Sequence, residues 1–128
     1  MPQAARFGAN ATSYLSLTTG LPAATPLTVT CRVYLVSDRN AAGQVWTLIS
    51  SNLATYQDVR VHTDGTTPRV GTNAANQVAS SGMSVGQWYH LAYVRNGSSH
   101  VLYLDGVQVA SVTSNISLTP AYFIIGSN

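Results

Sequence analysis

Residues 87–110, QWYHLAYVRNGSSHVLYLDGVQVA, alternate apolar and polar side chains twice over, around tight-turn signals at Asn96-Gly97 and Asp105-Gly106. Alternation with period two is the pattern of a strand that buries one of its faces. Asn-Gly and Asp-Gly accept the positive φ angles of short hairpin connections. The stretch therefore predicts a three-stranded antiparallel meander.

The rest of the chain also alternates apolar and polar residues, in short segments separated by Gly, Asn, Asp, Ser and Pro. Almost no segment has apolar residues at the spacing of a helix. We predict strands near Tyr14 and in segments 27–36, 44–50, 58–63, 68–72, 76–81 and 121–127. Asp64-Gly65 joins two of these segments as a hairpin. About ten short strands at spacings of roughly 8–12 residues predict an all-β fold, an antiparallel β-sandwich.

Composition limits the class of protein. The chain has 128 residues, 45% hydrophobic and 8% charged, which excludes a disordered chain and fits one globular domain over residues 1–128. No apolar run approaches the roughly 20 residues that span a bilayer, so we expect no membrane partner. The six arginines lie far apart in sequence, which argues against a nucleic-acid partner.

The order of a W-Y-H-L-A strand, a V-L-Y-L-D-G-V hairpin and a closing I-I-G-S-N resembles the laminin-G-like branch of the concanavalin A-like jelly rolls. ARFGANATSYLSL, LTVTCRVYL and VWTLIS are similar to the first three strands of that family, so the resemblance covers nearly the whole chain. It implies a non-catalytic jelly roll in which Trp88 and His90 are framework residues.

The sequence departs from this family in two places. Arg32 stands where many members carry tryptophan, which argues against an aromatic binding platform on that sheet. Members also usually continue past the G-S-N with strands that return beside the first strand. We therefore expect either the N-terminal part of a longer chain or an edge completed by something else, and an open edge favours association.

Catalytic chemistry has little support in the sequence. Glycosidases of the wider superfamily use two carboxylates, but this chain has no glutamate. Its four aspartates lie in or beside predicted turns: Asp38, Asp58, Asp64 and Asp105. There is no G-x-S-x-G motif, and the three histidines lack the spacing of zinc ligands: His62, His90 and His100. We predict that the protein is not an enzyme.

Ligand binding is assigned to the connection that contains SSNLATYQD. Tyr56 is the aromatic residue expected on a loop, and Asn52 and Asp58 lie beside it in sequence. The other large aromatics fall at strand positions and are expected to be buried: Trp46, Trp88, Tyr93, Tyr103 and Phe123. If calcium is a cofactor, Asp38 and Asp58 are the candidate ligands, although the chain is poor in carboxylates. Cys31, on the side of Val29 and Val33, is expected to pack in the core.

Two biological settings fit these features. The first is a structural or adhesive module of a phage virion, a capsid-decoration, tail or fibre protein, which binds other virion or surface proteins as an oligomer and can bind a glycan or host surface. The chain starts at Met1 without a signal-peptide core, and virion proteins leave the cell by lysis. The alternative is a lectin-like carbohydrate-binding module of a secreted bacterial protein, which is extracellular. A carbohydrate-active enzyme is the weakest hypothesis.

Overall fold

The computed structural model describes residues 15–17, 26–35, 46–49, 60–64, 67–71, 76–113 and 123–125. Within these residues there are ten strands and no helix, so the predicted all-β class is confirmed. No described segment could cross a membrane as a helix. The strands are β1 (Leu15–Leu17), β2 (Leu27–Tyr34), β3 (Trp46–Ile49), β4 (Arg60–Asp64), β5 (Thr67–Gly71), β6 (Asn76–Val78), β7 (Trp88–Asn96), β8 (Ser99–Leu104), β9 (Val107–Thr113) and β10 (Phe123–Ile125).

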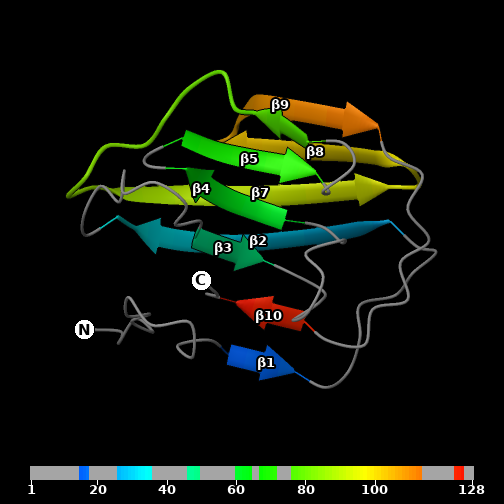
Figure 1. The fold of residues 1–128 in the computed structure, drawn as a ribbon, viewed down its shortest axis with the longest axis horizontal. Helices are drawn as coiled ribbons and strands as arrows, with labels where there is room; N and C mark the ends of the chain where they lie inside the picture. Colours follow the sequence, from blue (N-terminus) through cyan, green and yellow to red (C-terminus); the bar gives the residue numbers. More distant parts are fainter. Residues whose placement is uncertain are drawn as a thin grey trace.

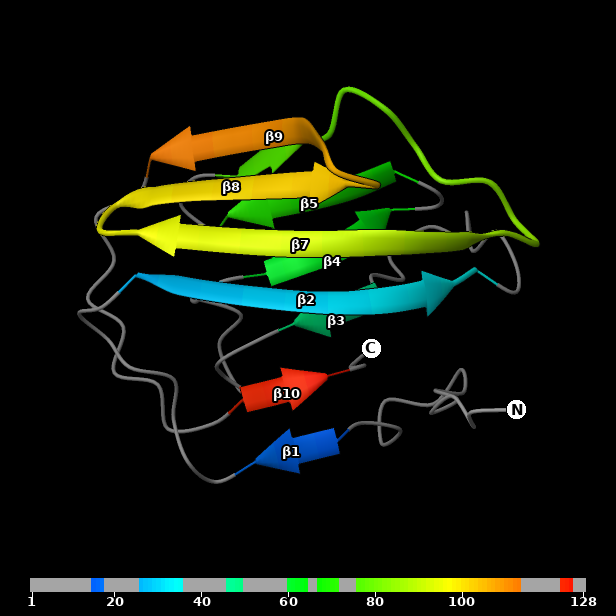
Figure 2. The same ribbon diagram turned by 180° about the vertical axis from the view of Figure 1, so that it is seen from behind.

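The strands pack as two antiparallel layers, which confirms the predicted β-sandwich (Figure 1). The back layer has the order β2-β7-β8-β9, and the front layer has the order β3-β4-β5-β6. A separate ribbon of β1 and β10 lies beside β3, and both views show it below the other strands (Figures 1 and 2). The back layer contains the predicted meander of β7, β8 and β9, with β2 added on its open side.

The first strand has a partner within the chain. β10 pairs with β1 in antiparallel register, from Leu15 opposite Ile125 to Leu17 opposite Phe123. β10 therefore covers one side of β1. The expectation that further strands or another partner complete this edge stays a prediction.

The core lies between the two layers. Side chains alternate in burial along β2 and β7, as period two requires, and the inward side chains of β7 and β8 are almost fully buried. The buried hydrophobic side chains are Leu35, Val70, Ala79, Met83, Leu91, Tyr93, Leu102, Leu104, Val109 and Ala110. Cys31, Val29 and Val33 pack against this cluster and are half-buried, which confirms the predicted side of β2. Burial raises the pKa of the Cys31 thiol.

The turns of the meander have the predicted chemistry. Gly97 has a φ of 58°, and Asp105 and Gly106 have φ values of 50° and 83°. These left-handed angles are tolerated by glycine and, less readily, by aspartate. Asp105-Gly106 forms the predicted turn between β8 and β9, whereas the turn between β7 and β8 is Gly97-Ser98, one residue later than predicted, because Asn96 still pairs with Ser99.

Residues 79–87, here named the crossing segment, carry the chain from the front layer to the back layer. The Ala79 amide donates to the Pro68 carbonyl on β5, and the Ser80 amide donates to the Val109 carbonyl on β9, each at 2.8 Å. Met83, 4% exposed, reaches into the core between the layers. The segment is thus attached to both sheets just before β7 begins.

Candidate functional site

The register of β2 and β7 brings four side chains together on the outer face of the back layer. Arg32 is opposite His90, and Tyr34 is opposite Trp88. Directly opposed residues of antiparallel strands point to the same side of the sheet. All four side chains are exposed, on the face turned toward the viewer in Figure 2. We name Arg32, Tyr34, Trp88 and His90 the Trp88 platform.

Trp88 is in contact with both Tyr34 and Arg32. The ring centroids of Tyr34 and Trp88 are 5.3 Å apart, with an interplanar angle of 53°. The guanidinium carbon of Arg32 lies 5.4 Å from the centroid of the Trp88 ring. Tyr34 and Trp88 nevertheless remain 45% and 50% exposed. These contacts restrain the side chains, and they leave aromatic surface open to solvent.

The crossing segment supports the Tyr34 end of the platform. The Gly86 amide donates to the Leu35 carbonyl at 2.8 Å. Gly86 has a φ of 82°, and a Cβ at this position would lie 3.9 Å from the Tyr34 hydroxyl oxygen. Glycine is therefore required at this position by the left-handed backbone angle. It is not required by crowding, because a Cβ would make only an ordinary contact with Tyr34.

Tyr89 holds the same segment to the start of β7. Its hydroxyl accepts a hydrogen bond from the Ser84 amide at 2.7 Å and donates to Oε1 of Gln87 at 3.2 Å. These bonds keep the loop folded back on the strand that carries Trp88.

Asp105 fixes β7 at His90. Its Oδ1 accepts a hydrogen bond from the His90 amide at 2.7 Å, and its own amide donates to the His90 carbonyl at 2.8 Å. One carboxylate oxygen of Asp105 is therefore bound to the backbone, which gives this aspartate a structural role in the turn. This pair of bonds holds the backbone under one corner of the platform.

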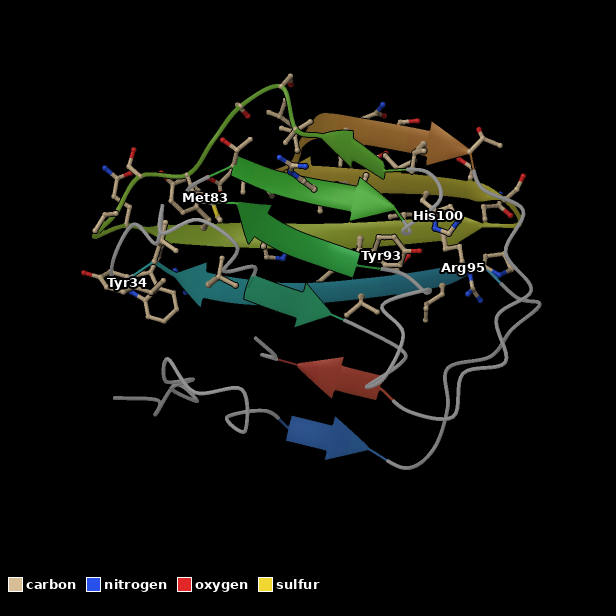
Figure 3. All side chains as sticks on the ribbon, viewed as in Figure 1. Tyr34, Met83, Tyr93, Arg95 and His100 are labelled. Atoms are coloured by element: carbon tan, nitrogen blue, oxygen red, sulfur yellow. The ribbon has the colours of Figure 1, made fainter. Side chains whose placement is uncertain are left out.

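A second polar group lies inside the sandwich. Tyr93, Arg95 and His100 are buried side chains of β7 and β8. They lie toward one end of the sandwich, whereas Tyr34 lies toward the other end (Figure 3). Burial raises the pKa of the Tyr93 hydroxyl well above its usual range, and the charge of Arg95 offsets part of that rise. The tyrosine thus keeps its proton, which suits a structural hydrogen bond.

The residues predicted to bind ligand or calcium lie outside the described residues. These are Asn52, Tyr56 and Asp58 for the ligand, and Asp38 and Asp58 for calcium. Their assignment stays a prediction. The three histidines lie on different strands: His62 on β4, His90 on β7 and His100 on β8. Within the described part of the chain, no three His, Cys, Asp or Glu side chains form a group that could hold a metal ion.

One expectation about the aromatic residues is wrong, because Trp88 is half exposed instead of buried. Arg32, which was expected to argue against an aromatic binding platform, lies with its guanidinium over the Trp88 ring, and binding on this face stays untested. Tyr93 is fully buried as predicted, whereas Tyr103 is only half-buried. Tyr34 was not among the residues that the sequence pattern singled out. Alternation could have predicted that Tyr34 is exposed, because it lies two residues after Arg32 and therefore on the same face of the strand.

The chain matches a known family and several solved structures. Residues 8–128 match the family model described as the concanavalin A-like lectin/glucanases superfamily. A Bacteroides ovatus protein described as carbohydrate binding is 13% identical with a TM-score of 0.60, over 91% of this chain and 32% of that chain. A search of curated proteins found no match.

Two further structures are similar over most of this chain. A sialidase is 16% identical with a TM-score of 0.61, over 90% of this chain and 11% of that chain. A heptameric SAP-like pentraxin from Limulus polyphemus is 23% identical with a TM-score of 0.55, over 88% of this chain and 56% of that chain. This chain therefore spans only part of the length of each of these proteins. At such identities, the likeness shows a shared fold.

Proposed function

The chain belongs to the concanavalin A-like lectin/glucanases superfamily, and on that premise we propose that it is a non-catalytic module that binds a carbohydrate on the Trp88 platform. One observation carries the proposal: Trp88 is restrained by Tyr34 and Arg32 and is still half exposed. The name of the similar Bacteroides ovatus protein points to the same class of ligand.

The chemistry of the platform suits a sugar. One face of a pyranose ring carries mainly C–H groups, which pack against an indole or phenol ring, while its hydroxyl groups need polar partners at the ring edge. The Trp88 and Tyr34 rings supply apolar surface, and the Arg32 guanidinium and the Tyr34 hydroxyl supply hydrogen-bonding groups beside it. Because cross-strand contacts already order these side chains, binding loses less conformational entropy.

The supply of acidic groups supports binding over cleavage. Glycoside hydrolysis ordinarily requires two carboxyl groups on opposite sides of the scissile bond. The chain has four acidic residues in all, none of them glutamate. Asp105, which lies next to His90, has its Oδ1 bound to the backbone amide of that residue. The platform is therefore proposed as a recognition surface.

A glycan array followed by titration calorimetry tests the proposal. Trp88→Ala should weaken binding of the selected glycan at least tenfold, about 1.4 kcal/mol, because the stacking surface is lost. Thr28→Ala is the matched control. Thr28 is exposed on the same face of β2 but about 20 Å from Tyr34 along the strand. Absence of any glycan ligand, or equal affinity of Trp88→Ala and the parent, would overturn the proposal.

The predicted rim site is distinguished in the same assay. Tyr56→Ala should leave affinity unchanged if the glycan binds on the Trp88 platform. Loss of binding in Tyr56→Ala, with Trp88→Ala unaffected, would instead move the site to Asn52, Tyr56 and Asp58.

Virion origin, with an extracellular protein as the alternative, stays a prediction from the sequence. Oligomers with other virion or surface proteins belong to the same prediction. The assignment of residues 1–128 to a single domain, alone or as the N-terminal part of a longer chain, is a separate prediction that also stays untested. Neighbouring genes for capsid, portal or tail proteins would support the virion. An upstream start with a signal peptide would contradict it and support the secreted lectin-like module.

A further inference from the structure

The Trp88 platform carries positive charge beside its aromatic surface. Arg32 and His90 are directly opposite one another on β2 and β7, and the Arg32 guanidinium lies over Trp88. Among the residues that the structure describes, no acidic side chain forms an ion pair with Arg32. The Arg32 guanidinium, 5.4 Å from the centroid of the Trp88 ring, can therefore bind a charged group on a ligand that stacks on Trp88.

The neighbouring strands do not neutralise this charge. Outward positions on β8 and β9 that the structure describes carry Ser99, Val101, Tyr103, Gln108, Ser111 and Thr113. Among the residues that the structure describes, Asp105 is the acidic residue beside the platform, and its Oδ1 accepts a hydrogen bond from the His90 amide while its carboxylate keeps its charge. That carboxylate is held by backbone at the His90 corner, whereas the Arg32 guanidinium lies over Trp88, in a chain of net charge +2.

The geometry of Arg32 favours a planar anion. The Arg32 guanidinium carbon lies over the Trp88 ring at 5.4 Å from its centroid, and a guanidinium carries N–H donors in a planar fork that can form two parallel hydrogen bonds to a carboxylate. A pyranose that stacks on the exposed Trp88 surface would bring its ring substituents next to these donors. A carboxylate on that sugar would then satisfy Arg32 without displacing it from the ring.

From this juxtaposition we infer that the Trp88 platform selects glycans that carry a carboxylate, the class of uronic-acid oligosaccharides. The inference rests on the proposed carbohydrate-binding function and adds the charge of its ligand. Trp88 and Tyr34 supply the sugar-binding surface, and Arg32 supplies the preference for the acid.

Pairs of oligosaccharides that differ only in charge test this preference. Oligogalacturonate, alginate oligomers and glucuronate-containing xylan oligomers are each compared with their carboxyl-reduced forms by calorimetry. At least one acidic oligomer should bind about tenfold or more tightly than its neutral form at low salt, a difference of about 1.4 kcal/mol. The preference should shrink as salt rises, because exposed charges are screened.

Variants assign the preference to Arg32. Arg32→Gln should reduce the affinity for the acidic oligomer about tenfold more than the affinity for its neutral form, whereas Thr28→Ala should preserve the ratio. A melting temperature close to that of the parent establishes that Arg32→Gln is folded. An unchanged ratio in folded Arg32→Gln would overturn the inference.

The remaining outcomes separate this inference from the proposed function. If no acidic oligomer is preferred but a neutral glycan binds in a Trp88-dependent manner, the inference fails and the function stands. If no glycan binds at all, both fail. Dextran sulfate that binds as tightly as the best uronate, without dependence on Trp88, would indicate nonspecific attraction to positive charge and would also overturn the inference.

Discussion

The hydroxyl oxygen of Tyr93 lies 2.7 Å from Nδ1 of His100, and both side chains are buried between the layers. Their rings stack with centroids 6.1 Å apart and an interplanar angle of 29°. Tyr93 is opposite Leu102 and His100 is opposite Arg95, so the hydrogen bond runs diagonally between β7 and β8. A polar contact placed this deep ties the two central strands of the back layer together.

Loss of this hydrogen bond should destabilise the fold. Tyr93→Phe leaves Nδ1 of His100 buried without the hydroxyl, and we expect the free energy of unfolding to fall by about 1–3 kcal/mol. Urea denaturation measures the change. Tyr103→Phe on the outer face of β8 is the control and should change stability by less than about 0.5 kcal/mol. Equal effects of the two substitutions would contradict a structural role for the Tyr93 hydroxyl.

Stability should also decline at alkaline pH. Burial raises the pKa of Tyr93 in the folded protein, and the charge of Arg95 offsets part of that rise. Burial also raises the pKa of Cys31. In the unfolded chain these groups release their protons near pH 10 and pH 8.5, so the native state then binds more protons than the unfolded state. The stability that comes from the protonated Tyr93 and Cys31 side chains is therefore complete below these pH values and is lost as pH rises above them.

Thermal denaturation between pH 7 and pH 10.5 tests this dependence. The parent should lose stability above about pH 8.5, with a steeper decline above about pH 10. Tyr93→Phe should reduce the steeper decline, and Cys31→Ala should reduce the earlier one. A melting temperature that rises with pH over this range would be inconsistent with both raised pKa values.

Strands and turns were readable from sequence because their signals are local. Period-two alternation predicted the side of Cys31, and Asp105-Gly106 predicted a turn that the structure confirms through φ values of 50° and 83°. These features depend on a few neighbouring residues and on the steric limits of the backbone.

The Trp88 platform was not readable in the same way. Tyr34 and Trp88 meet only because β2 pairs with β7 in one particular register, and alternation within a strand does not specify its partner. Trp88 was also predicted to be buried because it is large. Its parity, opposite to that of the buried Leu91 and Tyr93, was the better guide.

Asp105 should be replaceable only by a residue that keeps both its acceptor and its backbone angle. Asp105→Ala removes Oδ1 from the His90 amide and places alanine, which tolerates a left-handed backbone less well than aspartate, at a φ of 50°, so we expect a loss of about 1–3 kcal/mol. Asp105→Asn retains a side-chain oxygen and tolerates the left-handed angle, with an expected loss below about 0.5 kcal/mol. Equal stability of the two variants in urea denaturation would exclude this role.

Met83 should anchor the crossing segment beneath the platform. It is 4% exposed and packs in the core, whereas Val85, two residues later, is 45% exposed. Met83→Ala should therefore lower the free energy of unfolding by about 2–5 kcal/mol, and Val85→Ala by less than about 0.5 kcal/mol. Hydrogen exchange should accelerate at the Ser84 and Gly86 amides in Met83→Ala. Their hydrogen bonds to the Tyr89 hydroxyl and the Leu35 carbonyl form only while the crossing segment is folded. Unchanged exchange at both amides in a destabilised Met83→Ala would show that hydrogen bonds alone hold the segment against the back layer.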